Sequence, residues 1–528
     1  NLNSSLDHQQ VAITVKGRSG LVLLEFKPAE SEPARRPAPV PAVPSPAELS
    51  NPADLFRAGL HVEQYRDPLI AGAAYWRKAL DQDADHADCQ KALGLSLLQN
   101  ARFDEAVDHL KAAMTTLTKH NPNPRDGEVF YLLGHAFRGR DQIDAAYDAF
   151  SKAAWSYAWR SASYYCLAQI DSARNHSSEA ISHLRAALLT NSQNNKARVL
   201  LAALLRREGD IAEARAQISA LLLEDPLDHW ARNEWALLDN DASQAACSYF
   251  GVMLSNPDQT CLDIAFDYAG AGLLREALTV LEKLLAWPAR RSGAPAAVHY
   301  TTAWLHEKIG NSAKARACLN QASAAEATRD FPSRVEELVV LRWALASSPA
   351  CARTADHLAC LLYAKGWRDE AIRLWAEAIR NEPQGYRAYR NLAVGAFSHC
   401  HDLKRAVALL QRAHELVPAD PQVLCELEYV MDRAGIEPRE RQALFEASRV
   451  VVQTRDDLAL AKAKILNQMG DYDAALQALA GHAFVACEGG EHAIVEQHQF
   501  AHLALGRAAM AAKLWETGLG HFRAAQVI

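Results

Sequence analysis

From residue 53 onward, apolar residues recur with the spacing of amphipathic helices, and the same pattern returns at a fixed interval. Small residues mark this interval most clearly. Ala146, Ala180 and Ala214 follow one another at 34 residues, and Ala371 and Ala406 are separated by 35. An interval of about 34 residues is typical of stacked pairs of antiparallel helices. The pattern therefore predicts an all-α solenoid built from helical hairpins.

Each repeat has three positions that suit close packing of such hairpins. The anchor is a small residue in the second helix, found at Ala106, Ala146, Ala180, Ala214, Ala277, Ala315, Ala371, Ala406 and Ala475. Twelve residues earlier lies a second compact residue, at Gly94, Gly134, Ala168, Ala202, Ala265, Ala303, Ala359 and Ala463, whereas the repeat of Ala406 has Val394. Four residues after the anchor comes a large apolar plug, at Leu110, Phe150, Leu184, Ile218, Leu281, Leu319, Trp375, Leu410 and Leu479. Facing small residues let the helices approach closely, and the plug fills the space between hairpins.

This pattern resembles the tetratricopeptide repeat over most of residues 53–528, with nine clear repeats and degenerate ones near Gly72 and at the C-terminus. The resemblance implies a right-handed superhelical solenoid whose first helices line a concave groove. Groove positions lie six and three residues before the compact residue and one and four after it. The candidate groove-binding residues are Glu128, Tyr131, His135, Arg138, Tyr165, Gln169, Lys196 and Arg206. This partly cationic wall fits either a ligand-binding groove or a solvated helix face.

One known type of groove is absent. Co-chaperone repeats of this kind hold a terminal carboxylate with a Lys and an Asn on successive turns of one helix. The matching pairs here are Lys91 with Leu95 and Asn391 with Gly395, so neither helix carries the complete clamp.

The repeat period lapses once in the middle of the chain. Ala214 and Ala277 are separated by 63 residues, although the sequence after Asp225 still resembles a helix start. We therefore expect tetratricopeptide repeats in residues 53–224 and 263–528, with an irregular helical hairpin in residues 225–262.

The first 52 residues follow different patterns. Residues 11–16 alternate in polarity, residues 17–20 read as a turn, and residues 21–26 read as a returning strand, so residues 1–27 predict a β-hairpin. A two-stranded hairpin is marginally stable alone, and we expect it to be the remnant of a β-domain that precedes this chain. Residues 28–52 contain eight prolines, which predicts a semi-rigid linker.

Composition and motifs argue against several functions. The formal net charge is only −7, and no Lys/Arg-rich run suggests a nucleic-acid partner. No apolar run is long enough for a membrane helix. The ten cysteines have no regular spacing, which favours free thiols in a reducing, cytoplasmic environment. No nucleotide-binding, zinc-protease or nucleophile-elbow motif is present, so the sequence predicts no catalytic residue, no cofactor and no metal.

Two local clusters could still carry chemistry. The sequence from His399 to His401 holds two histidines and Cys400, but neighbouring residues of a helix point in different directions, which favours packing over a metal site. Aromatic residues are densest around Trp155, Tyr157 and Trp159. They suit either the filling of a repeat junction or stacking on a sugar.

A second resemblance rests on short segments: residues 60–66 (LHVEQYR), 121–128 (NPNPRDGE), 147–155 (YDAFSKAAW) and 225–229 (DPLDH). With the β-hairpin and proline-rich linker, they are similar to the C-terminal half of large bacterial proteins of an uncharacterised family. In that family, a β-sandwich resembling galactose mutarotase precedes a helical repeat region. The resemblance implies a carbohydrate-related function for the parent protein. It transfers no catalytic residue to this chain.

Three functional hypotheses follow. The first is a non-catalytic binding or assembly scaffold, whose partner is a protein, a peptide, the missing β-domain or a carbohydrate. The second is part of a carbohydrate-active enzyme, with the loop of residues 121–128 near the active site of an upstream β-sandwich. The third, an independent peptide-binding adaptor, is weaker because the carboxylate clamp is absent.

Overall fold

The computed structural model divides the chain into two compact units, residues 1–84 and residues 85–528. It describes residues 12–17, 19–27, 43–65, 71–238, 256–287, 294–325, 331–480, 482, 484 and 491–526. Most of the proline-rich linker and the second part of the expected irregular hairpin, residues 239–255, lie outside the described residues. Each unit is described by itself.

The first unit holds a β-hairpin and one helical hairpin. Strand β1 (Ile13–Lys16) pairs antiparallel with β2 (Val22–Phe26), as the sequence predicts, and every residue of both strands is exposed. The unit also contains the short helix η2 (Pro46–Glu48), α1 (Pro52–Tyr65) and α2 (Gly72–Gln82). The expected origin of the β-hairpin, a preceding β-domain, stays a prediction.

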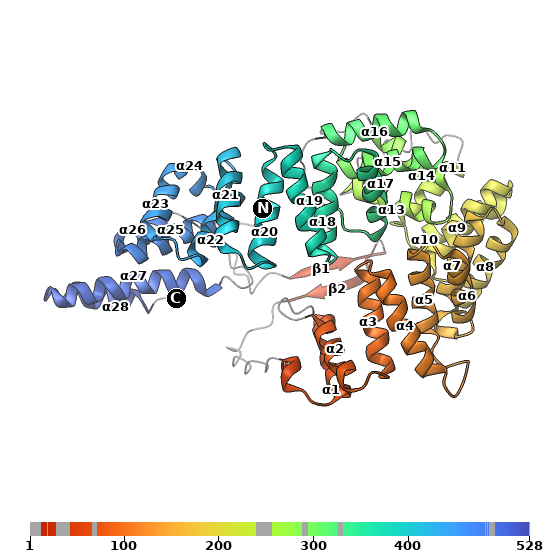
Figure 1. Ribbon diagram of the computed structural model, residues 1–528, viewed down its shortest axis with the longest axis horizontal. Coiled ribbons are helices and arrows are strands. Elements are labelled where there is room, and N and C mark those ends of the chain that lie inside the picture. Colours follow the sequence, from red (N-terminus) through yellow and green to blue (C-terminus); the bar gives the residue numbers. More distant parts are fainter. Residues whose placement is uncertain are drawn as a thin grey trace. The chain divides into compact units, whose positions relative to one another are not determined.

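The second unit is a succession of antiparallel helix pairs (Figure 1). The pairs are α3 (Ala87–Gln99) with α4 (Phe103–Thr118), α5 (Glu128–Gly139) with α6 (Ile143–Ala153), α7 (Tyr157–Ala173) with α8 (Ser177–Thr190), α9 (Asn195–Glu208) with α10 (Ile211–Glu224), α13 (Pro257–Gly270) with α14 (Leu274–Leu285), α15 (Ala296–Lys308) with α16 (Ser312–Ala324), α18 (Ala352–Ala364) with α19 (Arg368–Asn381), α20 (Tyr386–Ser398) with α21 (Leu403–Leu416), α25 (Asp456–Met469) with α26 (Tyr472–Ala480), and α27 (Glu491–Ala511) with α28 (Trp515–Ala524). Helix α22 (Pro421–Arg433) is followed by α23 (Pro438–Ala447) and the short α24 (Arg449–Val452). Helices α11 (His229–Leu238) and α17 (Val335–Ser347) have no second helix of their own in the described residues. The all-α solenoid expected from the sequence is confirmed.

The small residues of the repeat pattern lie at the crossings between paired helices. The anchors Ala146 and Ala214 are fully buried. A Cβ atom placed on Gly134 would lie 2.5 Å from the ring of Phe150, the plug of the same hairpin. The first helix therefore approaches its partner so closely that no side chain fits between them.

Two expectations about the register need correction. In the α20–α21 hairpin, the compact residue is the fully buried Ala393 rather than Val394, which is 38% exposed. The turn is one residue longer there, and His401 takes a positive φ of 55°. The C-terminal repeat is not degenerate, because Gly506 faces Phe522 with the same spacing as Gly134 and Phe150.

The α22–α23 hairpin replaces the two small residues with a buried ion pair. Arg441 occupies the anchor position four residues before the plug Phe445, and Glu428 occupies the compact position. The guanidinium lies 2.7 Å from the Glu428 carboxylate.

Some turns of the second unit also contact hairpins far away in the sequence. The indole Nε1 of Trp367, just before α19, donates to the carbonyl oxygen of Asn100 after α3 at 2.8 Å. Ser172 of α7 donates to the carbonyl of Ala271 after α13 at 2.7 Å. These contacts join hairpins that are not neighbours along the array.

Candidate functional site

The first group of predicted groove residues lies on α5. Glu128 forms an ion pair with Lys91 at 2.7 Å, and Tyr131 stacks on Trp159 with ring centroids 4.9 Å apart. His135 is half-buried against Tyr131. Burial, and then the positive charge of Arg138, lower the pKa of His135 to about 4, so its imidazole is neutral at neutral pH.

Arg138 connects the next two groove residues to the end of α13, which is distant in the sequence. Its Nη1 donates to Oε1 of Gln169 at 2.7 Å, and its Nη2 donates to the carbonyl of Gly270 at 2.7 Å. Gln169 in turn donates to the hydroxyl of Tyr165 at 3.1 Å. Burial raises the pKa of Tyr165 well above its ordinary value. The donors of Arg138 thus bind the protein's own backbone and side chains.

The remaining two candidates lie on α9 and are ion-paired. Lys196 lies 2.7 Å from Asp267, whose pKa is raised because burial outweighs the attraction of Lys196. Arg206 contacts both carboxylate oxygens of the fully buried Glu234, at 2.9 and 3.1 Å. Glu234 also accepts a hydrogen bond from Tyr268 at 2.5 Å.

These contacts give each of the three cationic candidates, Arg138, Lys196 and Arg206, a partner within the chain. Helices α11 and α13 supply Glu234, Asp267 and Gly270, which bind the cationic candidates. Sequence reasoning could place the candidates on one wall but not identify what faces them. Their role in ligand binding stays a prediction.

The same groove positions in the later helices carry exposed apolar side chains. With Ala393, Glu428 and Gly506 as compact residues, these positions include Val394 on α20, Tyr429 on α22, and Phe500, Leu503 and Met510 on α27. Their exposed fractions run from 37% for Met510 to 53% for Phe500. We call these five residues the C-terminal groove face. The candidate residues predicted from the sequence come only from the first clear repeats, but the same groove rule yields these five once Ala393, Glu428 and Gly506 are recognised as compact residues.

Ion pairs lie near the residues of the C-terminal groove face. Arg390 forms a bidentate ion pair with Glu426, with nitrogen–oxygen distances of 2.7 and 2.5 Å. Lys464 forms an ion pair with Asp432 at 2.7 Å. Phe397 packs edge-on against Tyr429 with ring centroids 5.8 Å apart. Asp432 and Lys464 occupy groove positions themselves, on α22 and on α25, which lies between α22 and α27 in the chain. A face that combines exposed apolar and charged side chains is suited to an amphipathic partner segment.

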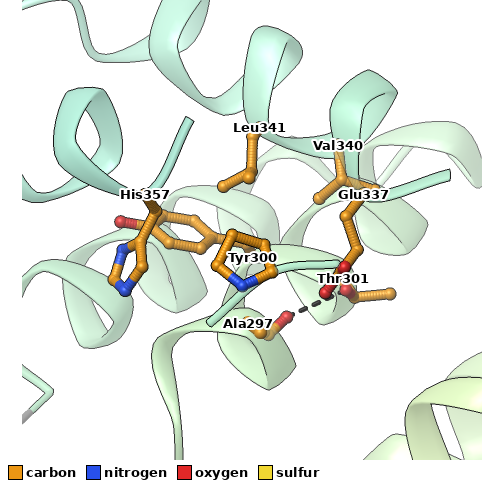
Figure 2. Close-up of a pocket in the computed structure, with 8 residues that line it drawn as sticks. Ala297, Tyr300, Thr301, Glu337, Val340, Leu341 and His357 are labelled. Atoms are coloured by element: carbon orange, nitrogen blue, oxygen red, sulfur yellow. Dashed lines mark hydrogen bonds between the residues drawn. The ribbon is translucent and has the colours of Figure 1, made fainter. Parts of the chain in front are cut away.

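A separate cavity lies between α15, α17 and α18 (Figure 2). Figure 2 shows Tyr300, Glu337 and His357 around it, and Thr301 donating to the carbonyl of Ala297 at 2.8 Å. Glu337 accepts hydrogen bonds from the backbone of Ser333 and Arg334, both at 2.7 Å. The cavity volume of about 10 Å³ matches a single water molecule, so it is too small for a substrate.

The aromatic cluster divides into a packed part and an exposed part. Trp159 is held by its hydrogen bond to Asp126 at 2.8 Å. Trp155 and Tyr157 are 69% and 71% exposed, and Lys152 lies over the Trp155 ring at 4.6 Å. The loop of residues 121–128 adjoins this cluster, because Lys152 also contacts Asn123.

The His399 to His401 segment forms a turn rather than a ligand set. His399 lies 3.0 Å from Asp369, and Cys400 is exposed. In the described part of the chain, no three His, Cys, Asp or Glu side chains gather closely enough to hold a metal ion. Among those same residues, no helix combines the length and apolar character needed to cross a bilayer.

Comparison with known protein families identifies the hairpins. Residues 173–232 match one tetratricopeptide repeat model, and residues 358–421 match a second. Within these two stretches, the hairpins match tetratricopeptide repeats. The first match spans most of α8 to α11, and the second spans α19 to α21, so one match lies on each side of the lapse in the period.

Solved structures similar to this chain include a Naa15/Naa10 complex bound to HypK, at 17% identity over 89% of this chain and 75% of that chain, with a TM-score of 0.25. The Cut9–Hcn1 complex of the APC/C matches at 15% identity over 91% of this chain and 95% of that chain, with a TM-score of 0.26. A tetratricopeptide repeat protein from Parabacteroides merdae matches at 13% identity over 51% of this chain and 92% of that chain, also with a TM-score of 0.26.

Proposed function

We propose that this tetratricopeptide array is a protein-interaction scaffold that binds an amphipathic segment of its partner on the C-terminal groove face. The supporting observation is that five apolar side chains at groove positions are exposed there, on three first helices of the array. At the earlier groove positions, Arg138, Lys196 and Arg206 are already engaged by the chain itself. Leu95 on α3 is also apolar and 36% exposed, but the later positions gather five such side chains.

The chemistry of this face indicates the kind of segment it binds. Burying an exposed aromatic or aliphatic side chain gives about 25 cal/mol per Å² of apolar surface removed from water. Tyr429, with Arg433 over its ring at 5.4 Å, offers both an apolar face and a polar tip. A partner helix or extended segment with apolar residues on one side and charges on the other complements this arrangement.

A displayed peptide library selected against the full chain tests the proposal. Selected peptides should be amphipathic, and the Tyr429→Asp/Phe500→Asp variant should bind them at least about tenfold more weakly, a loss of about 1.4 kcal/mol. The control is Leu189→Asp/Leu223→Asp, which changes two side chains that are 91% and 86% exposed elsewhere in the array. If both variants lose the same affinity for the selected peptides, or if Tyr429→Asp/Phe500→Asp loses none, the binding surface lies elsewhere.

A second proposal concerns a carbohydrate-related function. We infer that the array is the helical half of a carbohydrate-linked bacterial protein, either as a scaffold or beside a catalytic β-sandwich upstream. The observation that favours it is the pair of exposed rings, Trp155 and Tyr157, beside Lys152 and the loop of residues 121–128. Exposed aromatic faces next to hydrogen-bonding groups suit stacking on sugars.

Affinity electrophoresis in gels containing soluble polysaccharides tests this second proposal. Wild-type protein should be retarded by at least one polysaccharide, and Trp155→Ala/Tyr157→Ala should migrate as in a gel without sugar. Trp515→Ala, which removes another exposed ring, is the control. Unretarded wild-type protein across the series counts against sugar binding by this chain.

A further inference from the structure

The end of the α22–α23 hairpin departs from the regular repeat. Helix α23 ends at Ala447, and Ser448 leaves the helical conformation, with a φ of −106° and a ψ of 24°. The one-turn helix α24 follows before α25 begins at Asp456. An additional turn of helix therefore lies between the second helix of one hairpin and the first helix of the next.

A cavity of about 350 Å³ is lined by residues from α24, α25 and α26 and the segments that follow α24 and α26. Val452, Ala459 and Ala478 form its apolar part. The two residues that α25 contributes, Ala459 and Lys462, lie four and one residues before the compact Ala463, and neither is a groove position. The cavity is therefore separate from the C-terminal groove face, and its volume lies within the range of small-ligand sites.

Every charged residue that lines this cavity is basic. The three are Arg449, Lys462 and His482, and two amides, Gln453 and Gln477, complete the polar lining. In the described part of the chain, the side chains of Arg449, Gln453 and Gln477 make no ion pair or hydrogen bond. Their donors are therefore available to a bound group.

The other two basic side chains are held by carboxylates outside the lining. Lys462 lies 3.6 Å from Glu446, and Nδ1 of His482 lies 3.0 Å from Asp456. The Glu446 and Asp456 side chains are 51% and 48% exposed, so water screens their attraction. These contacts orient the two basic groups, whereas no carboxylate of the described residues pairs with Arg449.

We propose that this cavity binds a phosphate monoester. Such a group carries a charge of about −1.5 to −2 and three acceptor oxygens. Arg449 offers a planar fork of donors and Lys462 a compact positive charge, the two kinds of group that bind phosphate in proteins. Gln453 and Gln477 supply neutral donors, and His482 adds a third positive charge when its imidazole is protonated. A carboxylate, with one charge and two oxygens, uses fewer of these donors.

A phosphorylated side chain of a protein partner and a small phosphorylated molecule both carry this group, and calorimetric titration of the full chain separates them. The probes are phenyl phosphate and a phosphoserine peptide with neutral flanking residues. Benzoate and the unphosphorylated peptide should bind at least about tenfold more weakly than their phosphorylated counterparts. Tighter binding of the phosphopeptide assigns the site to a modified partner, and tighter binding of phenyl phosphate assigns it to a small molecule.

Charge-removing variants locate the site. Arg449→Gln/Lys462→Gln should weaken phosphate binding at least about tenfold. The matched control is Lys404→Gln/Arg439→Gln, which removes the same charges at two exposed positions outside the cavity and should bind like the wild type. Tyr429→Asp/Phe500→Asp should also retain phosphate binding, because this site does not depend on the C-terminal groove face. Far-UV circular dichroism verifies that each variant keeps its helices.

Three outcomes would overturn the proposal. The first is no binding of either phosphorylated probe to the wild-type protein. The second is equal affinity for the phosphorylated and unphosphorylated probes, which would exclude phosphate as the recognised group. The third is a folded Arg449→Gln/Lys462→Gln variant that binds no more weakly than the Lys404→Gln/Arg439→Gln control, which would place phosphate binding outside this cavity.

Discussion

Arg441 and Glu428 form a buried ion pair at the helix crossing where other hairpins have two small residues. The guanidinium nitrogen and carboxylate oxygen are 2.7 Å apart, and the side chains are 2% and 8% exposed. Burial raises the pKa of Glu428, and Arg441 partly offsets that rise by stabilising the carboxylate. Arg441 also contacts Asp432 at 2.8 Å and Gln468, so it joins α22 and α23 to α25.

Arg441→Met should destabilise the C-terminal hairpins by about 3–5 kcal/mol, because Glu428 is left as a buried charge without its partner. The double variant Glu428→Leu/Arg441→Met should recover part of that loss, since neither charge remains. Hydrogen exchange of α22 to α25 measures the local effect. A double variant no more stable than Arg441→Met would show that packing volume, rather than the unpaired charge, controls this crossing.

Gly134→Ala should lower stability although alanine is the better helix former. The new Cβ would lie 2.5 Å from the ring of Phe150, so the crossing must open, at a cost of about 1–3 kcal/mol. Gly520→Ala is the matched control, because a Cβ there meets nothing within 4 Å. That change should stabilise α28 by up to about 1 kcal/mol through helix propensity. Thermal melts of the two variants should move in opposite directions.

His135 should make the protein less stable in mild acid. Its folded pKa of about 4 lies below the ordinary value of 6.5, so the unfolded chain binds the proton first as pH falls. The stability that depends on a neutral His135 is fully present above pH 6.5 and is lost progressively as the pH falls toward 4. His135→Gln removes this titration, so the gap between the two melting temperatures should change across that window. If melting temperature plotted against pH gives parallel curves for wild type and variant, the lowered pKa of His135 is contradicted.

Trp367→Phe should loosen the contact between α3 and α19. The variant keeps an aromatic ring but loses the donor to Asn100, and a net hydrogen bond contributes about 1 kcal/mol. Amide exchange in residues 100–103 should accelerate, whereas Trp155→Phe, at an exposed ring, should leave it unchanged. Unaltered exchange in the first variant would mean that packing alone holds the turn.

The sequence predicted the parts of the fold that repeat. Gly134, Ala146 and Phe150 belong to one hairpin, and their spacing is fixed by local helix geometry. The same rule failed at Ala393, because a turn one residue longer shifts the compact residue by one. It also failed at Arg441, because a search for small residues cannot recognise an ion pair at the same crossing.

The candidate site was harder to predict because it depends on contacts that do not repeat. The positions of Arg138 and Lys196 on one wall follow from the register. Their partners, Gly270 and Asp267, come from a hairpin beyond the lapse in the period, and no spacing rule connects them. Part of the C-terminal groove face is predictable from the sequence, since the same rule applied at Gly506 yields Phe500, Leu503 and Met510.

The hydrogen bond from Trp367 to Asn100 spans 267 residues and has a consequence for how this chain folds. In an ordinary repeat array every contact is between neighbours, so folding starts at any hairpin and spreads. Here a contact between distant hairpins forms only after a long stretch of chain has been ordered or brought together, at an entropic cost that grows with its length. The array should therefore have a higher contact order and fold more slowly than a strictly nearest-neighbour array of the same length. Once closed, the segment between the two residues should unfold more cooperatively than independent repeats.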